Sequence, residues 1–306
     1  MNRDAHTAKS DGNTGVDSIA NEDHVHTLTT ALRGATASVC ALLLPALASA
    51  QMYLVDSLNE LATDFYRVKP STGQMRLMGT LPGSLGEAAG LAASSADVLY
   101  VSTLRGNIVR IDLSPTYRAT VLGNVGGALA LLEMDGGSLL GVDENTDELV
   151  RITLAPLAKQ VIGTLRTGGP QGPVVDVIGG DLARTAAGRI YMFTNSTTRS
   201  NSNGKLYLVD PTTAVATLIG PRDWGYGRIT GLSFDPADAT LYATGRDIDR
   251  LLVVSPISGM VTRATGLCRS CTVRYDIAAG DLAFAPLPTR TPTPMFRPTA
   301  TPTRRP

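Results

Sequence analysis

Histidine is absent from most of this sequence. All three histidines of the 306-residue chain, His6, His24 and His26, lie within its first 26 positions. If that segment is removed during export, the mature chain contains no imidazole. Ser-His-Asp and Cys-His nucleophilic catalysis are then excluded in their usual form, as are zinc and copper sites built on histidine. An enzyme of this sequence would depend on carboxylates, or on a hard cation held by oxygen ligands.

Aromatic residues are also few, at 5% of the chain, and the formal net charge is zero. We therefore expect a core built from Leu, Val, Ile and Ala. A chain without excess positive charge gives no electrostatic reason to expect nucleic acid or an anionic membrane as a partner. Length and composition favour one all-β domain.

An uncharged apolar run follows Arg33 and extends from Gly34 to Ala50. It ends in Ala48-Ser49-Ala50, which puts small residues at the positions that precede a signal-peptide cleavage point. The run is too short for a comfortable membrane span. We expect residues 1–50 to be a leader with a secretory signal peptide. The mature protein would then be secreted or held at a bacterial cell surface, with no transmembrane segment.

Two cysteines remain after the leader, Cys268 and Cys271. In an exported protein this pair predicts a short structural disulfide, which would stabilise the fold by about 2 kcal/mol in the chain-entropy treatment. A redox-active pair would need a helix N-terminus to lower the thiol pKa, and no helix is predicted here. A zinc site would need two further ligands, which the sequence does not supply.

A repeated strand pattern occupies the chain after residue 50. Each unit opens with a Gly-apolar strand, continues with a strand resembling Leu-Tyr, turns at a proline and stops at an apolar-Gly pair. The opening strands are Gly90-Leu91-Ala92, Gly127-Ala128-Leu129, Gly180-Asp181-Leu182-Ala183, Gly231-Leu232-Ser233 and Gly280-Asp281-Leu282-Ala283. Units of four short strands at a spacing of about 40 to 50 residues are typical of β-propellers.

The fifth unit is split between the two ends of this region. Its opening strand precedes Pro286, and its other three strands match Met52-Tyr53, Phe65-Tyr66-Arg67-Val68 and Met78-Gly79. Such a split lets the first and last strands pair and leaves no exposed sheet edge. We predict that residues 51–286 form an all-β, five-bladed β-propeller of four-stranded blades, with the last blade closed by N- and C-terminal strands. An open β-solenoid is the alternative.

Residues 287–306 are rich in Pro and Thr. Alternating Pro and Thr cannot form a sheet ladder or a core, so we expect a disordered tail or spacer.

Loop length predicts where a ligand binds. The loops after the second and fourth strands vary in length and open onto the same face, and variable loops on a rigid scaffold commonly carry binding. The only Trp of the chain lies in one of them. An aromatic ring flanked by Arg and Asp suits stacking against a sugar or another polar ligand. The candidate ligand-binding residues are Arg222, Asp223, Trp224, Tyr226, Arg228 and Arg246. Alternatively, Trp224 fills a gap between adjacent blades.

Four aspartates form a second candidate site. Asp176 and Asp181 recur with the spacing of Asp276 and Asp281 at equivalent positions of two units. Carboxylates near a common axis could hold Ca²⁺ or act as acid and base. The alternative is that each Asp accepts hydrogen bonds from backbone N–H groups of the neighbouring blade.

The acidic run 143–148 has the spacing of the front half of a calcium loop but lacks its central Gly and bidentate Glu. A solvated hairpin loop is expected there. No catalytic residue is assigned, and Ca²⁺ is the one cofactor considered.

Segment 205–220, followed by Ile229-Thr230-Gly231-Leu232 and Leu241-Tyr242, resembles the repeats of secreted bacterial propellers grouped under a domain of unknown function. More distantly it is similar to the NHL, YVTN and lactonase-like propellers. The resemblance covers about residues 51–286, implies a scaffold and carries over no catalytic residue. Lactonase-like relatives hold a divalent cation through Glu, Asn and Asp, a set that is not matched here position by position.

Three functions are compatible with these features. The expected one is an extracellular binding or interaction module that takes a ligand, a carbohydrate or a protein, on the variable-loop face. The second is a hydrolase that acts on a lactone or glycoside with a divalent cation or carboxylates. The third is a structural protein that assembles with itself at the cell surface.

Overall fold

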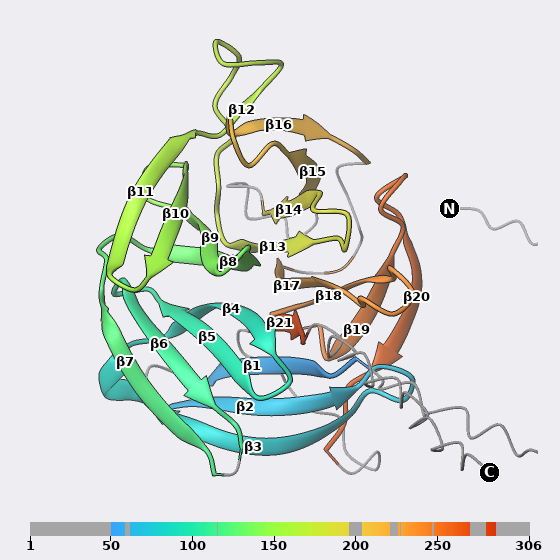
Figure 1. The fold of residues 1–306 in the computed structure, drawn as a ribbon. Coiled ribbons are helices and arrows are strands. Elements are labelled where there is room, and N and C mark those ends of the chain that lie inside the picture. Colours follow the sequence, from blue (N-terminus) through green and yellow to red (C-terminus); the bar gives the residue numbers. More distant parts are fainter. Residues whose placement is uncertain are drawn as a thin grey trace, which may run out of the picture. The chain divides into compact units, whose positions relative to one another are not determined.

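The structure, a computed structural model, describes residues 50–58, 62–114, 116–195, 204–220, 226, 228–246, 248–269 and 280–285. These residues form five sheets of mostly antiparallel strands around a central axis, which is the predicted five-bladed β-propeller (Figure 1). Within these ranges there is one short 3-10 turn, η1 (Gly83–Leu85), and no α-helix. No helix of the described part is therefore long and apolar enough to cross a membrane.

We number the blades in chain order, with the blade that closes the ring as blade 5. In each blade the first strand lies nearest the axis. Blade 1 consists of β4 (Ala88–Ser95), β5 (Val98–Thr103), β6 (Asn107–Asp112) and β7 (Arg118–Asn124), and blade 2 of β8 (Leu129–Asp135), β9 (Ser138–Asp143), β10 (Glu148–Leu154) and β11 (Leu157–Thr164). Blade 3 consists of β13 (Gly180–Arg184), β14 (Ile190–Thr194), β15 (Lys205–Val209) and β16 (Val215–Leu218), and blade 4 of β17 (Arg228–Phe234), β18 (Leu241–Arg246), β19 (Arg250–Val254) and β20 (Val261–Gly266). Blade 5 consists of β21 (Gly280–Phe284), β1 (Met52–Leu58), β2 (Ala62–Lys69) and β3 (Gln74–Pro82).

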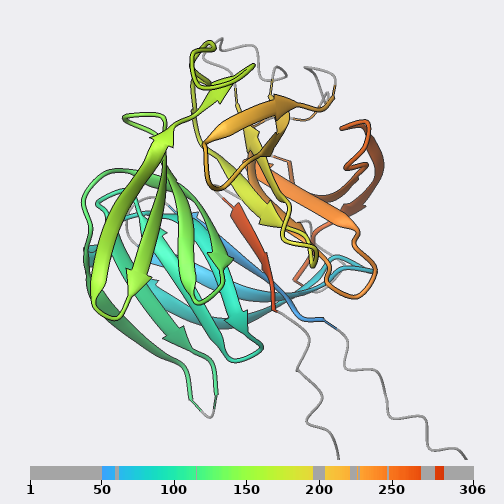
Figure 2. The same ribbon diagram turned by 45° about the horizontal axis from the view of Figure 1, so that its top comes forward.

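Blade 5 is closed by the two ends of the repeat region, as predicted. Strand β21 pairs antiparallel with β1, with Met52 opposite Phe284 and Tyr53 opposite Ala283. Figure 2 shows these two strands side by side. Strands β2 and β3 continue the sheet toward the rim. The closing strand thus pairs on one side and packs against blades 1 and 4 on the other.

Small residues occupy the innermost strands because neighbouring blades approach closely there. A Cβ atom added to Gly231 would lie 2.9 Å from Cα of Asp281 and 2.7 Å from the backbone nitrogen of Leu282. One added to Gly90 would lie 2.7 Å from Cβ of Leu132. Ordinary Cβ contacts are longer than this, so glycine at these two unit openings is required by the crowding at the axis.

The hydrophobic core lies in layers between adjacent blades. The layer between blades 2 and 3 contains Leu131, Val142, Leu182 and Ile190, in agreement with the expected aliphatic core. The few aromatic residues are used deep inside: Tyr53, Phe65, Tyr66 and Phe193 are among the largest fully buried side chains. Full burial of one large apolar side chain contributes about 1.5–3 kcal/mol.

Blade 3 departs from the expected four-strand unit. The segment that begins at Arg166, predicted as a variable loop, starts with a two-residue strand, β12 (Arg166–Thr167), which pairs parallel with β16. The guanidinium of Arg166 donates a hydrogen bond to the carbonyl oxygen of Gly172 at 2.9 Å. The N–H of Val175 donates to the carbonyl of Leu165. The strand therefore depends on hydrogen bonds within the loop, which the repeat pattern does not encode.

A side chain crosses every blade junction to bind the inner strand of the next blade. Serine hydroxyls make two of these contacts: Ser102 donates to the Leu129 carbonyl from blade 1 to 2 (2.7 Å), and Ser233 accepts from the Phe284 N–H from blade 4 to 5 (2.9 Å). Carboxyls make the other three. Glu133 accepts from the Arg184 N–H from blade 2 to 3 (3.0 Å), Asp181 from the Leu232 N–H from blade 3 to 4 (2.7 Å), and Asp281 from the Leu91 N–H from blade 5 to 1. Loss of one partner would leave a buried backbone group unsatisfied, which costs about 1–3 kcal/mol. We call these five contacts the junction hydrogen bonds.

Truncation tests ring closure. A chain ending at residue 279 lacks β21 and so loses the buried Leu282 and Phe284. Loss of two such side chains removes at least about 5 kcal/mol, which is comparable to the whole stability of many domains. We expect this chain to aggregate or to melt far below the full-length protein in circular dichroism. A chain ending at residue 286 is the control and should melt like the full-length protein. Equal melting of both truncations would contradict ring closure by β21.

Candidate functional site

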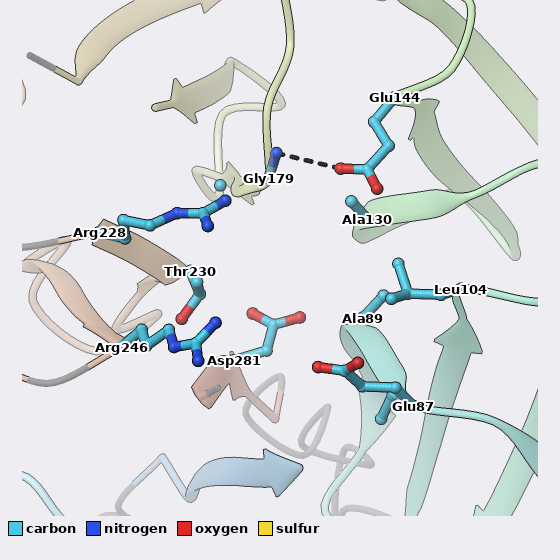
Figure 3. Close-up of a pocket in the computed structure, with 12 residues that line it drawn as sticks. Glu87, Ala89, Leu104, Ala130, Glu144, Gly179, Arg228, Thr230, Arg246 and Asp281 are labelled. Carbon is cyan, nitrogen blue, oxygen red and sulfur yellow. Dashed lines mark hydrogen bonds between the residues drawn. The ribbon is translucent and has the colours of Figure 1, made fainter. Parts of the chain in front are cut away.

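The innermost strands leave a pocket of about 260 Å³ at one end of the axis (Figure 3), which we call the axial pocket. All five blades contribute to it, so the site exists only in the closed ring. Its lining consists of Glu87, Ala88, Ala89, Leu104, Ala130, Glu144, Gly179, Gly180, Arg228, Thr230, Arg246 and Asp281. These residues lie at the starts of first strands and the ends of second strands. This is the variable-loop face, on which ligand binding is predicted from the sequence.

Positive charge enters the axial pocket from blade 4. Arg228 begins β17 and Arg246 ends β18, and the strand pairing places them directly opposite each other. Figure 3 shows both guanidinium groups extending into the pocket from the same side. Like charges at directly opposite positions destabilise a sheet. This pair therefore costs stability, and a bound anion would offset that cost.

Negative charge faces the two arginines from blades 1 and 2. Glu87 immediately precedes β4 and Glu144 immediately follows β9. In Figure 3 both carboxylates lie across the pocket from Arg228 and Arg246. Within the described part of the chain, the side chains of Glu87 and Arg228 have no hydrogen-bond or ion-pair partner. Glu87 and Arg228 thus face each other across the pocket without forming a contact pair.

Glu144 also holds the pocket wall in place. Its Oε2 accepts a hydrogen bond from the N–H of Gly179 at 3.1 Å, which links blade 2 to the segment before β13. Burial raises the pKa of Glu144, while the Gly179 N–H and the charge of Arg228 act in the opposite direction. Arg228 is therefore close enough to influence this carboxyl electrostatically, although the two are not in contact.

The floor of the axial pocket is Asp281, which is paired with Asp181. Both side chains are buried, and a hydrogen bond joins the two carboxyls, which requires a proton on one of them. Burial raises the pKa of Asp281 to about 8. Burial also raises the pKa of Asp181 well above its ordinary value, and the neighbouring charge of Asp281 raises it further. The pair therefore keeps a proton at neutral pH.

Glu133 is a third acid on the innermost strands, and it is half-buried. Its carboxylate accepts from the N–H of Met134 at 2.7 Å and of Arg184 at 3.0 Å. Burial raises the pKa of Glu133 to about 7, despite these two hydrogen bonds. The charge of Glu133 in turn raises the pKa of Asp281. Three junction carboxyls thus influence one another around the axis.

The structure brings together only part of the predicted ligand-binding set. Arg228 and Arg246 line the axial pocket, and Tyr226 is half-buried against the core between blades 3 and 4. Arg222, Asp223 and Trp224 lie outside the described residues. The proposal that Trp224 stacks on a ligand therefore remains a prediction.

The four aspartates predicted as a cation site do not form one group in the described residues. Asp181 and Asp281 meet at the axis, where each accepts an N–H of the neighbouring blade, as the structural alternative proposed. Asp176 is exposed and lines a different pocket, because the residues on either side of it, Val175 and Val177, are buried. Asp276 lies outside the described residues. The described part holds no group of three or more His, Cys, Asp or Glu arranged to bind a metal, so Ca²⁺ remains a prediction.

The acidic run 143–148 forms the turn between β9 and β10, and its side chains bind neighbouring backbone. Asp147 accepts from the N–H of Val177 at 2.8 Å. Asp143 is buried and accepts from Nζ of Lys159 at 3.3 Å. The expected hairpin turn is present, but it is tied to blade 3 and is not merely solvated.

Cys268 is buried beside β3, where the N–H of Met75 donates to its carbonyl. Cys271 lies outside the described residues. The disulfide between them remains a prediction, which mass spectrometry of the unreduced protein can test.

Comparison with solved structures finds matches of low sequence identity. The nidogen/laminin complex matches with 12% identity over 76% of this chain and 98% of that chain, at a TM-score of 0.48. Glutaminyl cyclase from Myxococcus xanthus matches with 19% identity over 67% and 88%, at 0.43. The PQQ-bound aldose sugar dehydrogenase from Streptomyces coelicolor matches with 19% identity over 57% and 61%, at 0.42. No protein-family model matches the chain. No curated protein matches it either. The family resemblance of the repeats therefore remains a prediction.

Sequence reasoning missed Glu87 and Glu133. A signal for Glu133 was present, because an acid inside the apolar strand Leu129–Asp135 is unusual unless it is paired or hydrogen-bonded. Glu87 gave no such signal, since it lies in a Gly-rich connection before β4. Glu87 becomes part of the site only because Arg228 of blade 4 faces it across the axial pocket.

Stability should decrease as pH rises from about 4 to 8. An unfolded Asp titrates near about pH 4, whereas Asp281 in the fold has a pKa of about 8. Between these values the folded state binds more protons than the unfolded state, so the free energy of unfolding falls with pH. Each extra proton contributes at most about 1.4 kcal/mol per pH unit. Glu133 acts in the same direction.

Urea denaturation at several pH values measures this slope. Asp281→Asn should flatten it, although absolute stability will also fall because an amide has one acceptor oxygen where the carboxyl has two. Asp97→Asn, on the exposed turn between β4 and β5, is the control and should keep the wild-type slope. A wild-type stability that increases over this range would contradict the protonated pair.

Proposed function

We propose that this protein is an extracellular binding module that takes a small ligand with both a negative and a positive group in the axial pocket. The proposal rests chiefly on one observation: Arg228 and Glu87 face the same pocket from opposite blades, and neither side chain has a partner among the described residues. The signal peptide predicted for residues 1–50 agrees with the proposed extracellular setting.

The charge pattern favours a ligand in which the two charges are separated. Arg228 and Arg246 together offer guanidinium donors that suit a carboxylate. Glu87 and Glu144 lie across the pocket and suit an ammonium group. The protonated pair below adds a floor that carries less negative charge than two free carboxylates would. An α-amino acid or a short peptide end has this bipolar chemistry.

The dimensions of the pocket favour a small ligand. Its volume of about 260 Å³ is below the range of about 300–1,000 Å³ typical of drug-sized ligands. Ala88, Ala89, Ala130 and Gly180 keep the wall smooth and short. Leu104 is the one large apolar side chain of the lining and offers a surface for a short aliphatic part of the ligand.

Binding of free amino acids tests the proposal. Titration calorimetry with a panel of α-amino acids should reveal a binder, whereas the matching carboxylic acids without an amine, and the amines without a carboxylate, should bind more weakly. Loss of one charge-assisted hydrogen bond costs about 1.5–3 kcal/mol, and about 1.4 kcal/mol is a factor of ten. Arg228→Ala should therefore weaken binding about 10- to 100-fold.

Two further variants make the result specific. Glu87→Gln should weaken binding of the amino acid but leave that of the amine-free acid unchanged. Arg189→Ala, an exposed cation of the β13–β14 turn, is the control and should bind like wild type. Equal binding of the amino acid by wild type and Arg228→Ala, or no binding by the whole panel, would remove the proposal.

A further inference from the structure

A second, larger pocket lies between blades 4 and 5, with a volume of about 770 Å³. It opens at the other end of the strands from the axial pocket: Gln51, which lines it, precedes β1, whereas Asp56 at the far end of β1 pairs with Gly280 beside Asp281. Four cationic residues line it, Arg67, Lys69, Arg76 and Arg263, against one acid, Asp235. We call this pocket the basic groove.

The cations of the basic groove are not neutralised within the described part of the chain. Arg67, Lys69 and Arg76 make no ion pair there, and Arg263 contacts the uncharged hydroxyl of Tyr242. Asp235 is held in its own turn, where it accepts from the N–H of Ala237 at 2.8 Å. The zero net charge of the whole chain therefore hides a local excess of positive charge.

Strand pairing concentrates this charge further. Arg67 and Lys69 are two residues apart on β2, so they share one face of the sheet. Arg76 on β3 lies directly opposite Arg67, and Gln74 lies opposite Lys69. Like charges in a directly opposite pair are destabilising. The fold maintains three cations on one outer hairpin without a structural partner, which is the arrangement expected of a surface that receives an anion.

We propose that the basic groove binds a linear acidic polysaccharide, with successive acidic groups contacting Arg67, Lys69, Arg76 and Arg263. A polymer suits the groove better than a single small anion, because the cations come from two blades and line a volume about three times that of the axial pocket. Arginine forks pair bidentately with carboxylate and sulfate groups. Gln51, Gln74 and Ser71 supply neutral hydrogen-bonding groups for sugar hydroxyls.

The sequence that follows the propeller extends the same charge. The N–H of Ala285 donates to the carbonyl of Gln51, so the chain leaves blade 5 beside the groove. Residues 287–306 contain four arginines and no acidic residue. These arginines lie outside the described residues and are not part of the basic groove.

A nucleic acid is the competing polyanion, and the lining disfavours it. Single-stranded nucleic acid is usually held by aromatic side chains on which bases stack. The one aromatic residue of the groove lining, Tyr242, is 6% exposed and packs against Phe284. A concave groove between two blades also accepts a single extended chain more readily than a duplex. An acidic polysaccharide needs no stacking platform.

Binding of oligogalacturonate by the full-length protein tests the proposal. We expect binding at low salt that weakens as salt increases, because exposed charges are screened. The fully methyl-esterified oligomer, which has the same backbone without charge, should not bind. The double substitution Lys69→Ala and Arg76→Ala should weaken binding about tenfold. The matched control is the double substitution Arg118→Ala and Arg189→Ala, which removes two exposed cations elsewhere and should bind like wild type.

Several outcomes would overturn this assignment. They are no binding of oligogalacturonate at low salt, equal binding of the esterified oligomer, and tighter binding of an oligonucleotide of equal charge. Equal weakening by both double substitutions would show that the effect is general charge and not the groove. A chain ending at residue 286 should still bind; loss of all binding on this truncation would move the site to the tail. Because these residues are not part of the axial pocket, the amino-acid experiment can fail or succeed independently.

Discussion

The propeller depends on the junction hydrogen bonds, in which a side chain of one blade binds the inner strand of the next. Hydrophobic packing between blades is non-directional and would tolerate sliding or opening of the ring. A buried backbone N–H that finds its acceptor on the adjacent blade is directional, and leaving it unpaired is costly. Four junctions have such a contact, and at the fifth the Ser102 hydroxyl satisfies the buried Leu129 carbonyl in the same way. The contact from Asp281 also closes the ring between the C-terminal strand and blade 1, so the same side chain completes the fold and forms the floor of the axial pocket.

Three of the five junction side chains are carboxyls, and this choice creates a conflict at the axis. A carboxylate accepts two N–H bonds well, as Asp181 does from Leu182 and Leu232. The strands that carry these acids converge, so Asp181 and Asp281 meet in a buried space where two charges would repel. Retention of a proton resolves the conflict. The axis thus keeps its hydrogen bonds and lowers its charge, so that the arginines of blade 4 and the glutamates that face them set the charge of the pocket above it.

The sequence predicts the fold well because every unit carries its own signals. Gly at the unit opening and Pro at the third turn are local, and the missing strands of the fifth unit imply closure without knowledge of contacts. The site is harder to predict because Glu87 and Arg228 belong to blades 1 and 4 and face each other only across the closed ring. Arg67 and Arg76 are likewise hidden, since their opposition depends on the register of β2 and β3. Strand β12 depends on bonds within one loop, for which the repeats give no signal.

The two pockets share a feature that the fold itself does not need. In each, two arginines lie directly opposite each other on adjacent strands, Arg228 with Arg246 and Arg67 with Arg76. Such a pair costs about 0.2–1 kcal/mol, which a domain with about 5–15 kcal/mol of stability can tolerate. The two pairs lie at opposite ends of the strands, one facing acids across the axis and one facing almost none. The first arrangement selects a ligand that carries both charges, and the second selects an anion. Placement of these charges near strand ends, outside the buried layers, leaves the junction hydrogen bonds undisturbed, because none of the four arginines takes part in them.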